Sequence, residues 1–267
     1  QQGLPVFCPF PGRIVAARNG DEADMGSRNF VLTRHRGNLG GKAIEFYMLF
    51  YHLDRESMGG PQTPPWLRGA DKAPFFGDLT SDRVAFPEVD VAGGDLIGHA
   101  GQAGPPGDFT GQIHVEVFSK DEIGERLDPG FWKPIDASRS GHFCEAPEIL
   151  GLIDRPKGRG DGILTAQELR DFFTRDDSRE ELRKLAVRYV SEWGESPSYE
   201  AELARSKDFA KLAKPVRARL FKTQIEPTLW WNAEVAEKTG LPADYIVWHY
   251  HPVRFVAWMS QQLGKQV

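Results

Sequence analysis

The pattern of hydrophobic residues changes near residues 137–146, and this change constrains the fold more than any other feature of the 267-residue chain. Before it, short runs of β-branched and aromatic residues are bounded by Gly and Asn, as in residues 12–20, 28–37, 43–54 and 111–119. Such runs are typical of β-strands. Residues 55–78 are rich in Gly and Pro and predict a long surface loop between strands. The first part of the chain is therefore expected to be β-rich.

From about residue 145 the pattern predicts helices. Thr165 is followed at the third position by Glu168, and Ser178 by Glu181, so each pair forms a capping box that can open a helix. After Ser178, apolar residues recur at a spacing of three and four, which predicts an amphipathic helix over residues 178–193. That stripe consists of Leu182, Leu185, Ala186, Tyr189, Val190 and Trp193.

Two further helices are predicted near the end of the chain. Pro227 is expected to open a helix that carries Trp230 and Trp231 and ends at Gly240, and Pro252 is expected to open the last one. The expected fold class is therefore α+β with two domains. Residues 1–140 would form an antiparallel β domain, and residues 141–267 an all-α domain.

Composition narrows the class of protein. The net charge of -5 is that of an acidic chain, whereas a nucleic-acid-binding domain usually has a basic face. No apolar run is long enough to cross a membrane, and no charged-then-apolar start of a signal peptide is present. For Cys8 and Cys144 we expect buried thiols; a disulfide between them is the alternative, because spacing cannot establish pairing.

A motif in residues 111–118 suggests a family. The run Gln112-Ile113-His114-Val115-Glu116 resembles the His-x-His-x-Glu strand of lysostaphin/LytM-type zinc endopeptidases, which cut peptidoglycan cross-bridges, with Gln112 in place of the first histidine. Residues 4–20, 30–35, 46–54 and 91–104 resemble other segments of that family in the same order. The resemblance covers most of residues 1–136 and implies cell wall as the substrate.

The same resemblance implies an incomplete peptidase site. His114 falls at a zinc-ligand position, and His52 and Gln112 fall where the family has two catalytic histidines. The His-x-x-x-Asp motif that supplies the other ligands is not found before Pro5, and a protein zinc site needs three or four ligands. Glutamine also cannot transfer a proton. We therefore expect no zinc in this chain and a degenerate domain that binds the wall or supports its neighbour. A plain scaffold and a peptidase with ligands upstream of Gln1 are the alternatives.

Residues 152–169 resemble an enlarged EF-hand loop. Asp154 would open the loop, Asp161 would stand at the Asp-Gly turn, and Glu168 would close the loop as the bidentate ligand of Ca²⁺. Strict spacing from Glu168 instead puts Lys157 at the first ligand position, where a cation cannot bind metal. Two interpretations are open: a structural calcium site, or a Gly-rich turn whose acidic residues cap a helix.

Glu192 is the candidate catalytic residue. On the predicted helix it lies on the same stripe as Leu185 and at the negative end of the helix dipole, next to Trp193. Both the apolar surroundings and the dipole disfavour the ionised carboxylate, so its pKa should be raised. A raised carboxyl pKa suits the general acid of a glycosidase. The alternative is a helix-terminal glutamate that is turned to solvent or bound to an arginine such as Arg188.

Residues 145–260 as a whole resemble the C-terminal module of type VI secretion effectors that degrade peptidoglycan, with a lysozyme-like Ser-Glu-Trp at residues 191–193. Trp193, Trp231, His249 and His251 would then bind the glycan. Trp230 and Trp231 point about 100° apart on a helix, so one of them is expected to pack in the core. For His249 and His251 we favour a cleft wall or a satisfied interior pair over a zinc site, because a third ligand is not evident.

The resulting hypothesis is a lysozyme-type peptidoglycan hydrolase with Glu192 as the acid. The resemblance implies an antibacterial effector secreted without a signal peptide that acts in the periplasm of a target bacterium. Its expected partners are peptidoglycan, an immunity protein and a secretion-apparatus component. A zinc endopeptidase and a non-catalytic wall-binding module are the alternatives. A second catalytic group is not evident from the sequence; Glu195 and Asp208 are candidates.

Overall fold

A computed structural model describes residues 3–20, 26–104, 107–140, 147–154, 160, 165–196, 199–204 and 207–264. Its centre is an eight-stranded sheet in the order β10-β11-β12-β9-β4-β3-β2-β5. Only β10 and β11 pair in parallel; the other neighbouring strands are antiparallel. Four further strands form two small sheets, β1 with β6 and β7 with β8. The strands are β1 (Pro5–Phe7), β2 (Gly12–Arg18), β3 (Asn29–Leu39), β4 (Lys42–Leu53), β5 (Val89–Val91), β6 (Leu96–His99), β7 (Gln102–Ala103), β8 (Thr110–Gly111), β9 (His114–Ser119), β10 (Lys133–Asp136), β11 (Leu185–Val190) and β12 (Ile246–Tyr250).

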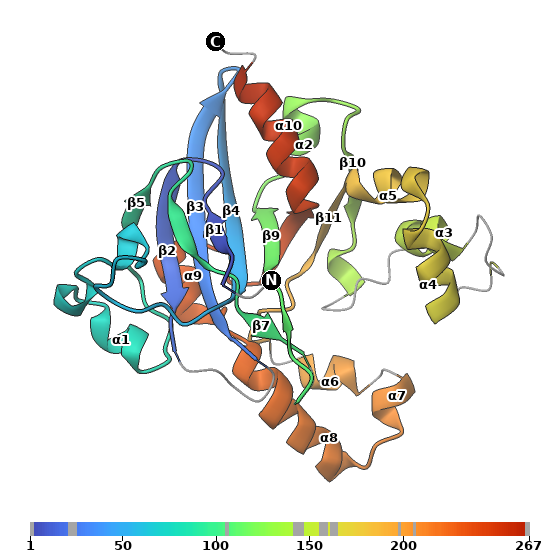
Figure 1. Cartoon of the computed structure of the whole chain (residues 1–267). Coiled ribbons are helices and arrows are strands. Elements are labelled where there is room, and N and C mark those ends of the chain that lie inside the picture. Colours follow the sequence, from blue (N-terminus) through green and yellow to red (C-terminus); the bar gives the residue numbers. More distant parts are fainter. Residues whose placement is uncertain are drawn as a thin grey trace.

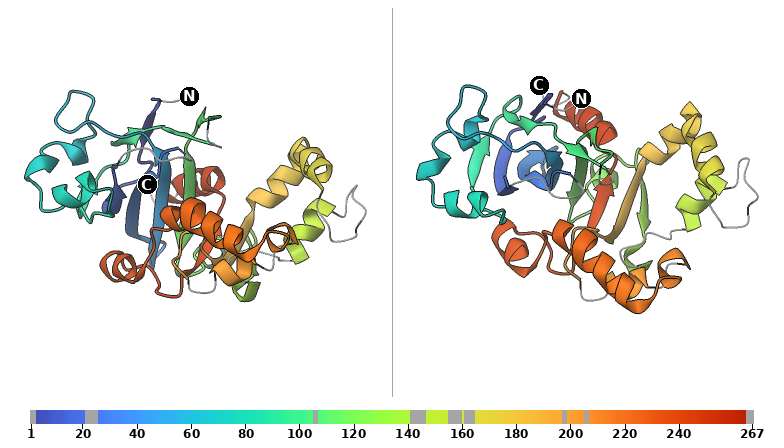
Figure 2. Two further views of the ribbon diagram at one scale, coloured as in Figure 1. Left: turned by 90° about the horizontal axis from the view of Figure 1, so that it is seen from below. Right: turned by 60° about the horizontal axis from the view of Figure 1, so that its bottom comes forward.

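The described helices are short and lie around the sheet. They are α1 (Phe76–Thr80), α2 (Gly124–Leu127), α3 (Pro147–Asp154), α4 (Ala166–Phe173), α5 (Asp176–Arg183), α6 (Tyr199–Leu203), α7 (Lys207–Ala210), α8 (Lys214–Leu220), α9 (Ala233–Thr239) and α10 (Pro252–Gly264). Helices α3–α5 lie beyond β10 and β11, at the end of the molecule opposite α1 (Figures 1 and 2). Helices α6–α8 project below the sheet in Figure 1.

The alternation of side chains along the central strands gives the sheet two apolar faces. One face packs under α10 and contains Met48, Val117 and Phe255. The other packs under α9 and the segment before it, and contains Tyr47, Phe118 and Trp231. The register places Tyr47 opposite Phe118 and Met48 opposite Val117, which fixes the face to which each side chain points.

The expected all-α C-terminal domain is wrong. Strands β11 and β12 belong to the second part of the chain, and β12 pairs with β9, so one mixed sheet runs through both parts. Residues 185–190, predicted as helix, form β11 instead. In that segment Leu185, Val187 and Tyr189 alternate as the residues of one strand face do. Leu185, Ala186, Tyr189 and Val190 also fit the stripe of a helix. Pairing with β10 and β12 satisfies the backbone hydrogen-bonding groups on both sides of this segment, and the segment is therefore a strand.

Other local predictions have mixed outcomes. The capping box of Thr165 and Glu168 is confirmed: Thr165 Oγ1 accepts from Glu168 N, and the Glu168 carboxylate accepts from Thr165 N. Ser178 is not a cap, because α5 begins at Asp176. Pro227 lies in a short 3-10 turn, and Trp230 and Trp231 precede α9, whose N-cap is Asn232. Gly240 does end that helix, with φ 79°, and α10 begins at Pro252 as predicted.

Cys8 is a buried free thiol, as expected, and Cys144 lies outside the described residues. The Cys8 thiol donates to the carbonyl oxygen of Phe10 at 3.2 Å. None of the helices in the described part of the chain is long and apolar enough to span a bilayer.

Candidate functional site

Strand β9 supplies two of the three side chains that meet at the candidate site. His114 and Glu116 are two residues apart and therefore point to the same face of the sheet, the face that carries Phe118. His114 pairs in register with Tyr51 of β4, and Glu116 pairs with Leu49. The site is thus built on the central strands of the sheet.

Glu116 is the most enclosed group of the site. Its Oε1 accepts hydrogen bonds from His114 Nε2 at 2.7 Å and from Trp193 Nε1 at 3.1 Å. Its Oε2 lies 3.8 Å from Nδ1 of His249 and has no hydrogen-bond partner in the described structure. A buried carboxylate with these contacts is held in one orientation, because each donor fixes the position of an oxygen.

The segment 191–195, which carries Glu192, is held by backbone hydrogen bonds to Trp230 and Trp231. The carbonyl oxygen of Trp193 accepts from the N–H groups of Trp230 and Trp231, and Glu195 N donates to the carbonyl of Trp231. Gly194 fits closely here: a Cβ on it would lie 2.6 Å from Cγ of Tyr245. The Trp193 ring stacks on Tyr51, with ring centroids 4.5 Å apart.

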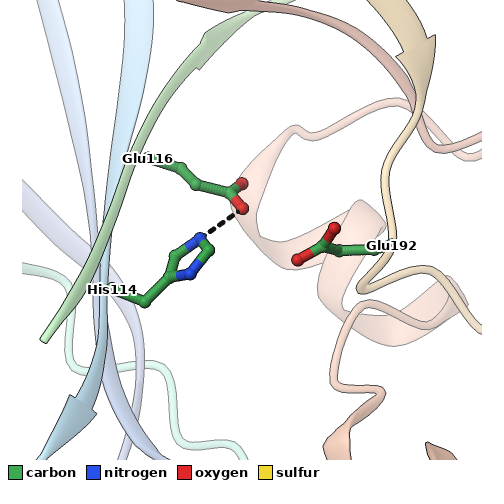
Figure 3. Close-up of side chains that lie close together, drawn as sticks. All are labelled: His114, Glu116 and Glu192. Atoms are coloured by element: carbon green, nitrogen blue, oxygen red, sulfur yellow. Dashed lines mark hydrogen bonds and ion pairs between the residues drawn. The ribbon is translucent and has the colours of Figure 1, made fainter. Parts of the chain in front are cut away.

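These two segments bring Glu192 to the His114–Glu116 pair. One side-chain ligand atom from each of His114, Glu116 and Glu192 lies within 4.8 Å of the others. Figure 3 shows the carboxylate of Glu192 turned toward the hydrogen-bonded pair across a short gap. Glu192 is nevertheless the most solvent-exposed of the three, so the cluster has an open side.

The charges of the pair stabilise each other. Burial disfavours the charged form of His114, but the hydrogen bond and charge of Glu116 outweigh it and raise the histidine pKa. Burial likewise disfavours the Glu116 carboxylate, yet the contact with His114 lowers its pKa. Burial lowers the pKa of His249 to about 4, so His249 is neutral near pH 7 and the partner charge there comes from His114.

The pKa of Glu192 shifts in the direction opposite to that of Glu116. Desolvation of its carboxyl, followed by the negative charge of Glu116, raises its pKa to about 7, while His114 acts in the opposite direction. The residue is exposed, but its carboxyl is turned inward among protein groups and loses hydration there. The predicted rise in pKa is confirmed. The predicted helix dipole is not its cause, because Glu192 follows β11 and does not end a helix.

The three side chains could also hold a divalent cation, since imidazole and carboxylate are common ligands. Two ligands of one tetrahedral zinc ion stand more than about 3 Å apart. His114 Nε2 and Glu116 Oε1 are closer, at 2.7 Å, and bond to each other. A cation would therefore have to replace this hydrogen bond. Nothing in the site distinguishes zinc from calcium.

Of the two other residues of the predicted peptidase site, His52 lies near His114 and Gln112 is exposed. His52 has φ 61°, a left-handed backbone that is uncommon for a non-glycine residue, and its Nδ1 lies 2.6 Å from the carbonyl oxygen of Ser27. The charge of His114 contributes to lowering the His52 pKa, after the larger effect of burial, so the two rings are neighbours. Gln112 is exposed, and its backbone N–H donates to Gly101.

The predicted glycan-binding residues differ in their burial and in their contacts with the site. Trp193 supports Glu116, and His249 flanks the same carboxylate. His251 is half-buried at the start of α10. Trp230 and Trp231 are both completely buried, so the expectation that one of them leaves the core is wrong. Their shared role is to anchor segment 191–195 through its backbone.

The predicted calcium loop is described in part. Asp154 is buried at the end of α3, and its Oδ1 accepts from Gly160 N at 2.8 Å. Glu168 takes part in the capping box of α4. Asp161 lies outside the described residues, as does Lys157. Both groups that can be placed have protein partners, which leaves the two interpretations of the loop open.

Glu116 is the site residue that the sequence reasoning missed. Its signal was the spacing His114-x-Glu116 on a predicted strand, which places both side chains on one face. The partners of Glu116 come from distant segments, Trp193 and His249, which no local pattern could connect with it.

Comparisons with known proteins give no relative. No family model matches the chain, and neither a curated protein nor a solved structure does.

Proposed function

We propose that this protein hydrolyses the glycan strands of peptidoglycan and that Glu192 is the general acid. The observation that carries the proposal is a carboxyl with a pKa of about 7 turned toward a charged His114–Glu116 pair at the open side of the site. Such a carboxyl is protonated in a useful fraction of molecules at neutral pH and can donate its proton to the leaving oxygen of a glycoside. The class of substrate rests on the sequence resemblance.

The residues around Glu192 have distinct tasks in this reaction. After proton donation Glu192 becomes a carboxylate, and the imidazolium of His114 stabilises that negative charge. Glu116 keeps His114 charged and oriented. Because Glu116 is enclosed and already accepts two hydrogen bonds, we assign it to positioning and not to attack on the sugar. Water or the acetamido group of the substrate itself is then the nucleophile, and the Glu192 carboxylate takes back a proton from the water that completes the hydrolysis.

Glu192→Gln tests the acid directly, because it keeps the shape of the side chain and removes the proton. Purified sacculi are digested with each protein, and the products are separated and their ends identified. We expect new reducing sugar ends with the unaltered protein and at least a hundredfold fewer with Glu192→Gln. Glu237→Gln is the matched control: it makes the same change at an exposed glutamate of α9 and should retain activity.

Two outcomes would replace the proposal. New amino termini in place of reducing ends would indicate peptide cleavage. Loss of activity with a chelator, restored by a divalent cation, would indicate that His114, Glu116 and Glu192 bind a metal. Undiminished release of reducing ends by Glu192→Gln would remove this residue from the mechanism.

Delivery as an antibacterial effector is the second part of the proposal. It is supported by the resemblance of residues 145–260 to modules of type VI secretion effectors. The protein is produced in a bacterium with and without an added export signal. We expect lysis only in the exported form, because peptidoglycan lies outside the cytoplasmic membrane, and none with exported Glu192→Gln. Lysis without export would contradict a cell-wall target.

A further inference from the structure

A recess lies on the same face of the sheet, next to the His114–Glu116–Glu192 cluster. It has a volume of about 280 Å³. Its floor is formed by alternate residues of β11, Leu185, Val187 and Tyr189, and Leu182 of α5 and Ile149 of α3 also line it. These side chains make the recess chiefly apolar.

His249 connects this recess to the site. It lines the recess, stacks on Tyr189 with ring centroids 4.0 Å apart, and places Nδ1 3.8 Å from Oε2 of Glu116. In register, Val187 pairs with His249 and His249 pairs with Phe118, which follows Glu116 by two residues on β9. Tyr189 also precedes Glu192 by three residues. When a substrate is held at Glu192, a group attached beside the cleaved bond can therefore reach this apolar recess.

Positive charge lies close to the end of the recess formed by His251, which we call its rim. Arg183 and Arg254 both pair with Glu180, at 3.0 Å and 3.5 Å, so two guanidinium groups share one carboxylate. His251 lines the recess and lies close enough to Arg183 and Glu180 for their charges to act on it.

We propose that this recess binds the peptide substituent of the glycan, so that the protein selects peptide-bearing strands over bare ones. An apolar floor fits small aliphatic side chains, and a guanidinium rim fits carboxylates. The stem peptide of peptidoglycan has both, as alanine methyl groups and acidic residues. The inference rests on the proposed glycan cleavage and names the part of the substrate that sets specificity.

The test compares strands that carry stem peptides with the same strands after an amidase has removed them. We expect the unaltered protein to cleave the peptide-bearing strands at least about tenfold more efficiently in kcat/KM. Val187→Thr keeps the shape of the floor but adds a hydroxyl, and should reduce that preference roughly tenfold while cleavage of bare strands is unchanged. Arg183→Gln at the rim should reduce it as well.

Val91→Thr is the matched control. Val91 and Val187 are both 8% exposed strand valines, but Val91 lies on β5 at the opposite edge of the sheet. It should leave the preference intact, and equal melting temperatures of the two variants would show that Val187→Thr does not act through stability. Equal cleavage of the two kinds of strand by the unaltered protein would overturn the inference and leave the role of Glu192 standing.

A binding measurement distinguishes failure of the proposed glycan cleavage from failure of the proposed peptide site. Binding of a soluble stem tripeptide of alanine, glutamate and a diamino acid is measured by calorimetry with the Glu192→Gln and Val187→Thr proteins. Tripeptide binding by the Glu192→Gln protein, with weaker binding by the Val187→Thr protein, would support the recess as the peptide site even if no strand is cut. Absence of binding to Glu192→Gln would refute it.

Discussion

The indole nitrogen Nε1 of Trp193 donates a hydrogen bond of 3.1 Å to Oε1 of Glu116 and thereby connects the segment of Glu192 to the strand of His114. These residues are far apart in the sequence, and neither segment forms the site alone. The acceptor is a buried carboxylate, so this bond should contribute both to stability and to the geometry of the site.

Trp193→Phe should therefore destabilise the protein by more than the loss of packing. A hydrogen bond to a charged group contributes about 2 kcal/mol, and the buried carboxylate of Glu116 would lose a donor. Trp231→Phe makes the same truncation at a buried indole whose Nε1 has no partner in the described structure. We expect the free energy of unfolding, measured in urea, to fall by about 2 kcal/mol more for Trp193→Phe. Equal losses would show that the bond contributes nothing.

The pH dependence of activity should follow the proton of Glu192. A general acid works when protonated, so kcat/KM should decline as the pH rises through about 7. His114→Gln removes a positive charge that lowers the Glu192 pKa, so the declining limb should move to higher pH. The profile of each protein is measured on soluble glycan strands at constant ionic strength. A limb that stays in place, or moves to lower pH, would count against coupling of the two groups.

The sequence predicted the raised pKa of Glu192 but neither the residues around it nor the fold. In the structure the groups that act on Glu192 are Glu116 and His114, which lie on a strand far along the chain. The prediction of the fold failed where two periodicities fit the same segment. Residues 185–190 match a helical stripe and a strand alternation equally, and the choice depends on edges offered by β10 and β12. Such partners lie far along the chain, so local pattern cannot supply them.

Stability should fall in acid because of His35. This side chain is 2% exposed and stacks on Phe46; its Nδ1 lies 2.9 Å from the Pro11 carbonyl and its Nε2 2.8 Å from Thr33 Oγ1. Burial lowers its pKa to about 4 from the ordinary 6.5. The unfolded chain therefore binds a proton more readily, and this contribution to stability is lost as the pH falls from 6.5 toward 4.

The size of this effect follows from the shift in pKa, and is about 3 kcal/mol at pH 4 relative to pH 7. Urea unfolding at a series of pH values measures it. His35→Gln removes the titrating group, so we expect a flatter dependence of the free energy of unfolding on pH between 6.5 and 4. An unchanged slope in that variant would mean that His35 does not titrate as its burial requires.

Gly194 offers the sharpest test of how segment 191–195 is held. A Cβ at this position would lie 2.6 Å from Cγ and 2.9 Å from Cβ of Tyr245, so alanine forces the segment or the ring to move. We expect Gly194→Ala to lower the free energy of unfolding by about 1–3 kcal/mol. It should also reduce activity at least about tenfold, because a small displacement of Glu192 from the substrate is costly. Gly77→Ala is the control: Gly77 lies in α1, and a Cβ there would meet nothing within 4 Å. That variant should be as stable as the unaltered protein or slightly more so, with full activity. If Gly194→Ala behaves in the same way, the close approach to Tyr245 does not position Glu192.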